Sequence, residues 1–134
     1  MTTATHATHG TPTLPARFSI AWGFLVLNIY FKDIHDVFRA GFIEEVQAGT
    51  FNGNPITEGV ILAGGIGTTV LVAMVFLPLF LTVRANRWLN GIMAPLAVAM
   101  IASTPRNDMD DTWFTLVLLA TLSWILVAAV RGKG

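Results

Sequence analysis

The sequence predicts an all-α, polytopic membrane protein with four transmembrane helices in a compact antiparallel bundle and a short outer interfacial helix. The first observation is composition: 54% of the 134 residues are hydrophobic and only 12% are charged. Soluble domains contain about 25% charged residues. The second is a mean hydropathy of +0.65. The third is that four separate stretches of the chain contain no charged residue at all.

The four charge-free runs cover residues 18–31, 59–83, 88–105 and 112–130, which are 14, 25, 18 and 19 residues long. A bilayer core requires about 20 apolar residues per helix. The last three runs are therefore long enough to span, while the first must continue past its own end. We predict spans at about 18–38, 58–83, 87–104 and 112–130. The short link at 84–87 predicts a tight antiparallel hairpin.

The first sixteen residues form a segment rich in Thr, Ala, His, Pro and Gly. A secretory signal begins with basic residues and continues with an apolar stretch, and this segment contains neither. We therefore expect residues 1–16 to be a disordered polar tail, followed by a transmembrane domain over 17–134.

The basic residues predict the orientation. Four spans place five of them on one side without any acid, and three on the other side with all eight acids. The positive-inside rule then predicts that both termini lie in the cytoplasm, and we expect the protein in the inner (cytoplasmic) membrane. The five are Arg17, Arg84, Arg87, Arg131 and Lys133, and the three are Lys32, Arg39 and Arg106.

Composition also excludes several classes of function. The formal net charge is zero, which argues against nucleic acid as a partner. The absence of cysteine excludes disulfides and thiolate metal sites. No phosphate-binding glycine loop, metalloprotease helix or nucleophile elbow occurs. We therefore expect no catalytic residue, cofactor or metal. The charge-free runs of the last three spans also contain no ionisable side chain that could pass a proton or ion across the bundle, which argues against a monomeric pump.

The end of the first span contains the most informative polar residues. At 100° per residue, Asn28, Lys32, His35, Asp36 and Arg39 fall on one stripe. Lys32 and Asp36 form an i,i+4 pair, and Asp36 and Arg39 an i,i+3 pair.

Ionisable groups at membrane depth are costly, so two interpretations of this stripe stay open. One is a polar pocket at the outer mouth of the bundle, with His35 as the group that changes charge near neutral pH. The other is a helix end whose charges reach the headgroups and pair locally. If a ligand-binding pocket exists, its residues are Asn28, Tyr30, Lys32, Asp33, His35, Asp36, Arg39 and Glu58.

The segment between the first two spans is expected to lie at the outer surface. Residues 40–49 resemble a short amphipathic interfacial helix, and residues 49–57 are a turn region rich in Gly and Asn. Glu58 then opens the second span, where an acid suits the helix dipole. Glu58 could instead reach Lys32 or Arg39.

Small residues on the second span predict close helix packing. Gly59, Ala63 and Gly67 recur at i,i+4 spacing, which lets helix backbones approach closely. We expect this face to pack against the first or third span, with self-association as the alternative. At the inner surface, Trp88 is expected to anchor the third span, and Asn86 and Asn90 to cap helices.

Three sequence features resemble a family of small bacterial four-helix integral membrane proteins of unknown function. They are the run Asn28-Ile-Tyr30-Phe-Lys-Asp33, the Gly-x-hydrophobic stretch that opens the second span, and Arg84-Ala-Asn86-Arg87-Trp88-Leu-Asn90. The resemblance extends from about residue 18 to the end of the fourth span. It implies four helices and a membrane location, and it indicates Tyr30, Asp33, Asn86, Arg87 and Asn90 as positions that the family uses.

These observations favour a non-enzymatic accessory or assembly subunit that acts through helix packing. Its expected partners are the lipid bilayer, a second copy or a larger membrane complex. Two alternatives stay open: a binder or enzyme for a lipid-soluble, quinone-like molecule at the outer pocket, and a homo-oligomeric channel.

Overall fold

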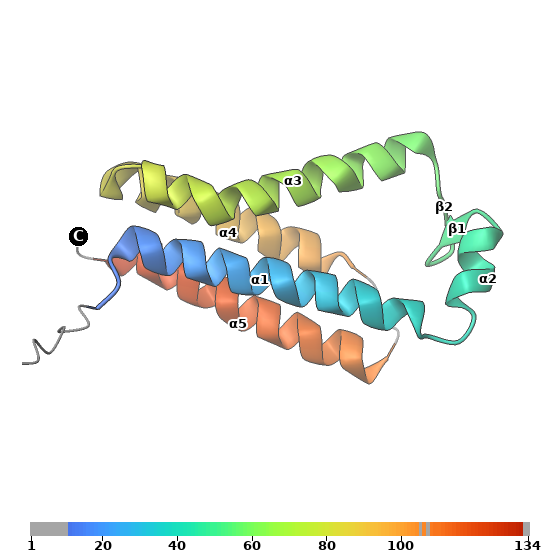
Figure 1. Cartoon of the computed structure of the whole chain (residues 1–134). Helices are drawn as coiled ribbons and strands as arrows, with labels where there is room; N and C mark the ends of the chain where they lie inside the picture. The colour runs from blue at the N-terminus through green and yellow to red at the C-terminus, as the bar shows by residue number, and fades with distance from the viewer. Residues whose placement is uncertain (1–10, 105, 107, 133–134) are drawn as a thin grey trace, which may run out of the picture.

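The chain is almost entirely helical. A computed structural model of the protein describes residues 11–104, 106 and 108–132 (Figure 1). Four long helices, one short helix and a small hairpin follow one another along these residues. In chain order they are α1 (Leu14–Val37), α2 (Phe42–Gln47), β1 (Thr50–Phe51), β2 (Asn54–Pro55), α3 (Glu58–Phe80), α4 (Val83–Ala102) and α5 (Met109–Arg131).

Three of the described helices are long and apolar enough to cross a membrane: α1, α3 and α5. The fourth long helix, α4, has 20 residues, and Arg84 and Arg87 lie in its first two turns. The composition of the three helices agrees with the predicted membrane class.

The long helices alternate in direction, and α1 lies between α3 and α5 (Figure 1). The main packing partners are α1 with α3, α4 with α5, and α1 with α5. Buried apolar side chains from all four long helices form one core. Its largest fully buried members include Trp22, Phe18, Leu25, Met74, Leu122 and Ile125.

The two ends of this bundle differ in charge. The positive end contains Arg17, Arg84, Arg87 and Arg131, because α1 and α4 begin there and α3 and α5 end there. The acidic end, where α1 ends and α5 begins, contains all eight acids of the chain together with Lys32, Arg39 and Arg106. Figure 1 shows α2 and the hairpin at this acidic end.

Local sequence signals fix where the helices begin. The side chains of Thr57, Thr82 and Asp108 accept hydrogen bonds from backbone N–H groups in the first turns of α3, α4 and α5. The first helix begins at Leu14, inside the segment predicted as a polar tail, because Pro15 suits the first turn of a helix. Residues 1–10 of that tail lie outside the described residues.

The connection between α1 and α3 contains more structure than a turn. The expected amphipathic segment at 40–49 contains α2. The turn region 49–57 folds into a hairpin in which Thr50 pairs with Pro55 and Phe51 with Asn54. At its tip Asn52 and Gly53 have φ values of 49° and 74°, the positive angles that a two-residue hairpin turn favours.

The expected packing of the small-residue face on α3 is wrong. A Cβ atom placed on Gly64, Gly65 or Gly67 would meet nothing within 4 Å, and one on Gly59 would meet only Thr57. The buried residues of α3 all lie in its second half. Val75 in that half lies beside Gly23 of α1, where an added Cβ atom would make an ordinary van der Waals contact with it, while the first half of α3 diverges from the bundle (Figure 1). We call residues 58–70 the open half of α3.

Candidate functional site

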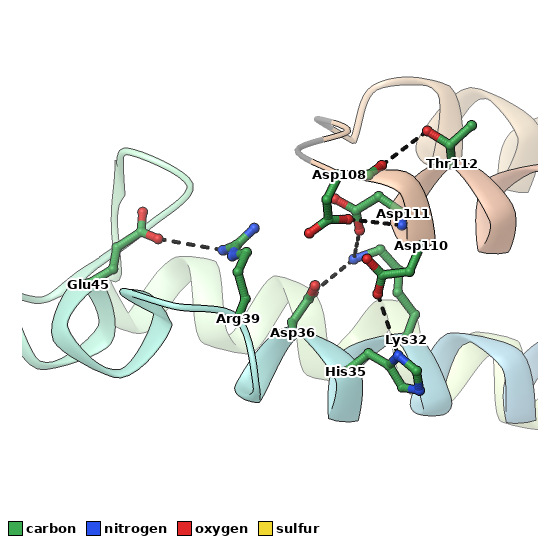
Figure 2. A network of polar contacts seen from close by, with 9 residues as sticks. All are labelled: Lys32, His35, Asp36, Arg39, Glu45, Asp108, Asp110, Asp111 and Thr112. Atoms are coloured by element: carbon green, nitrogen blue, oxygen red, sulfur yellow. Dashed lines mark hydrogen bonds and ion pairs between the residues drawn. The ribbon is translucent and has the colours of Figure 1, made fainter.

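A shared ion pair joins α1 to α5 at the acidic end (Figure 2). The Lys32 Nζ atom lies 2.8 Å from Asp36 Oδ2 and 2.7 Å from Asp111 Oδ1. Asp36 is 6% exposed and Asp111 is 1% exposed. The predicted pair of Lys32 with Asp36 is therefore confirmed, and Asp111 is an additional partner. We call these three residues the ion triad.

The triad is arranged as a structural contact between the two helices. An ammonium group has three donors, so Lys32 can bind a carboxylate on each side. Asp111 lies in the first turn of α5, where the helix dipole favours a negative charge. Its backbone N–H donates to the Asp108 side chain at 3.1 Å. The ion pair with Lys32 and the helix dipole compensate the burial of the Asp111 carboxylate, while the bond to Asp108 satisfies a backbone donor at the start of α5.

Two weaker ion pairs flank the triad at the surface. The His35 Nδ1 atom lies 3.5 Å from Asp110 Oδ2, and the two side chains are 55% and 40% exposed. The His35 ring also packs edge-on against Phe114 of α5. Asp108, which precedes α5, shares a hydrogen bond with the Asp110 carboxyl group, and this contact raises the pKa of Asp108 above its usual value.

Arg39 pairs with Glu45 of α2 and not with Asp36 as the helical spacing suggested. The Arg39 Nη2 atom lies 3.7 Å from Glu45 Oε2. The second oxygen of Glu45 accepts from the backbone N–H of Gly53 at 2.8 Å. Glu45 therefore joins the end of α1 to the hairpin.

The other predicted site residues do not join the triad. Asn28 donates to the Phe24 carbonyl of its own helix at 2.8 Å, and Tyr30 and Asp33 are exposed on α1. Glu58 lies in the first turn of α3, as expected of a helix start. Among the described residues it forms no ion pair with Lys32 or Arg39.

The geometry of the acidic end favours a structural role, in which charged side chains pair with one another, over a ligand-binding pocket. Among the grooves formed by the described residues, four well-formed ones include one lined by Arg39, and Lys32, His35, Asp36 and Asp111 line none of these four. Sequence reasoning did not select Asp110, Asp111 or Glu45 as site residues. The available signal was the acidic run Asp108-x-Asp-Asp, which precedes the last span on the same side as Lys32.

A second polar network lies at the positive end, where α4 caps its neighbours. The Asn86 side chain donates to the carbonyls of Pro78 and Leu81 at 2.8 and 3.1 Å. Arg87 donates to the carbonyls of Ala129 and Val130 at 2.8 and 2.7 Å. Carbonyls at the C-terminal end of a helix have no partner within it. Asn86 and Arg87 therefore cap α3 and α5, and the capping expected of Asn86 is confirmed.

A buried hydrogen bond connects this network to α1. Trp22 Nε1 donates to Asn90 Oδ1 at 2.6 Å, and Asn90 Nδ2 donates to the Asn86 carbonyl at 2.8 Å. Trp22 and Asn90 are both fully buried. The two asparagines of α4 thus bind α1 and α3 from the same helix.

The exposure of the His35 pair leads to a testable expectation. Ion pairs between exposed groups contribute about 0–1 kcal/mol. We expect His35→Gln to change the free energy of unfolding in detergent by less than about 1 kcal/mol. A larger loss of stability would mean that His35 is part of the structural contact between α1 and α5. The same measurement on Asp110→Asn, which removes the charge of the other partner, is the control.

Fold and site together define a helical protein with three helices suited to a membrane, in which polar residues at both ends bind helices to one another. The chain belongs to a family of unknown function, DUF6326, whose model matches residues 14–129. This confirms the resemblance to an uncharacterised family, and the polar side chains of both networks lie within the matched range. Neither the search of curated proteins nor that of solved structures found a match.

Proposed function

We propose that this protein is a non-enzymatic assembly subunit of the inner membrane that binds another transmembrane helix through the open half of α3. In this proposal α1, α3, α4 and α5 all span the bilayer, and both termini face the cytoplasm. The charge difference between the two ends supports this orientation, since basic residues favour the cytoplasmic side.

The length and position of α4 support a fourth span. A 20-residue helix is about 30 Å long, which matches the hydrocarbon core of a bilayer. Its two arginines lie at the positive end, beside the start of α1 and the end of α5. Arginine side chains near a helix end can reach the headgroups.

The observation on which the proposed role depends is the open half of α3. None of residues 58–70 is buried. Gly59, Ala63 and Gly67 repeat at i,i+4, and small residues at this spacing let membrane helices pack through their backbones. Lys32, Asp36 and Asp111 at the acidic end are paired with one another, which favours a helix face over this cluster as the surface that binds a partner.

Cysteine cross-linking in native membranes tests this role, and the natural chain contains no cysteine. Single variants Ala63→Cys and Gly67→Cys are treated with a short bifunctional thiol reagent. The control is Leu116→Cys on α5, where Leu116 is 59% exposed. We expect cross-linked products from α3 and not from the control. A product of twice the 14.5 kDa chain mass identifies a second copy, and another mass identifies a different subunit. Equal yields at all three positions would contradict the proposal.

A further inference from the structure

A groove between α4 and α5 opens at the positive end, close to the arginine network. It has a volume of about 720 Å³. It lies outside the acidic end and outside the open half of α3. Its lining includes Arg84, Arg87, Trp88, Gly91, Ile92 and Val130.

The mouth of this groove has a fixed positive charge. Arg87 is held by the Ala129 and Val130 carbonyls through two of its nitrogens. A guanidinium group has five N–H donors, so Arg87 keeps donors for a further acceptor. Arg84 lies one helical turn earlier and is exposed. All eight Asp and Glu residues lie at the opposite end, so no acidic side chain of the described residues neutralises these two arginines.

The part of the groove around Gly91, which we call its floor, is apolar and unfilled. A Cβ atom placed on Gly91 would meet nothing within 4 Å. Ile92 and Val130 provide aliphatic walls. Trp88 is 70% exposed at the same place, and tryptophan prefers the level of the lipid headgroups. A ligand that fits must combine an anionic group with a hydrocarbon chain.

We propose that this groove is a binding site for one anionic phospholipid of the cytoplasmic leaflet, with its phosphate at Arg84 and Arg87 and an acyl chain over Gly91. The proposal rests on the membrane location proposed above. Basic pockets between transmembrane helices on the cytoplasmic side are suited to anionic headgroups. The apolar floor distinguishes this ligand from a free phosphate ion.

The test is native mass spectrometry of the full-length protein in mild detergent, titrated with dioleoyl phosphatidylglycerol or dioleoyl phosphatidylcholine. We expect one phosphatidylglycerol to be retained in preference to phosphatidylcholine. Arg84→Gln should weaken its binding roughly fivefold, the contribution typical of one basic side chain near anionic lipid. Gly91→Leu should also weaken it, because the new side chain fills the floor.

Two control variants test whether lipid binding depends on the groove itself or only on the positive charge of this end. Arg131→Gln removes one positive charge from the same end without touching the groove lining, and Ala99→Leu adds the same side chain at an exposed position of α4 outside that lining. Both should bind as the natural chain does, and all four variants should keep its unfolding midpoint. Equal retention of the two lipids, equal losses in variants and controls, or displacement by excess inorganic phosphate would each overturn the lipid site.

Failure of this inference is distinguishable from failure of the proposed function. An alkaline wash of cell membranes that releases the protein contradicts its integral membrane location. A protein that stays in the washed membrane but shows no lipid preference contradicts only the lipid site.

Discussion

Replacement of Lys32 by methionine is expected to lower the free energy of unfolding by about 3 kcal/mol. Removal of one partner from a buried ion pair leaves the remaining charge without compensation, which costs about 3–5 kcal/mol. In Lys32→Met the carboxylates of Asp36 and Asp111, which are 6% and 1% exposed, lose their shared cation. Reversible unfolding in mixed micelles with increasing sodium dodecyl sulfate measures the change.

A double-mutant cycle with Asp111→Asn assigns this loss to the pair. The amide keeps the shape of the side chain but removes its charge, so the second substitution should cost less in the Lys32→Met background than in the natural chain. Glu58→Gln is the matched control, because Glu58 is exposed at the same end of the bundle and forms no ion pair with Lys32 among the described residues. Additive effects of Lys32→Met and Asp111→Asn would show that the two residues do not stabilise one another.

The second large effect is expected at Asn90. Asn90→Leu removes the acceptor of the Trp22 indole and the donor to the Asn86 carbonyl, all within the buried interior. An unsatisfied buried polar group costs about 1–3 kcal/mol. We expect a loss of about 2 kcal/mol in the same unfolding measurement.

The Trp22→Phe substitution completes the cycle for Asn90. Phenylalanine has no N–H group, so Asn90→Leu should be less harmful beside it than beside tryptophan. Trp113→Phe on α5 is the control, since Trp113 is 65% exposed. If Asn90→Leu costs the same beside phenylalanine as beside tryptophan, the hydrogen bond does not contribute to stability.

Hydropathy and charge predicted the long helices because these properties are local to each segment. The start of α3 at Glu58 and the existence of α2 follow from signals within a few residues: an N-cap threonine and an amphipathic stretch. The pair of Lys32 with Asp36 was predictable for the same reason, because both residues lie on one helix.

Contacts between distant segments were not predictable in this way. Asp111 joins Lys32 because α5 packs against α1, and the sequence placed the two residues at the same end of the predicted bundle without indicating which helices are neighbours. The open half of α3 was assigned to internal packing, since spacing shows that small residues share a face but not which helix approaches it. The hydrogen bond from the Trp22 indole to Asn90 also depends on tertiary packing, because the two residues lie on α1 and α4.

The contact between the first and last helices has a consequence for biosynthesis. Lys32 and Asp111 are separated by about 80 residues, and a ribosome adds roughly 5–20 residues per second. For about 4–16 seconds of translation, Lys32 therefore has Asp36 but not the aspartate that will complete its pairing. During that interval the contact between α1 and α5 has not formed, and the Lys32 ammonium group has one carboxylate partner in place of two. Chaperones or quality-control proteases of the membrane would encounter the chain in this state, before its last segment is made.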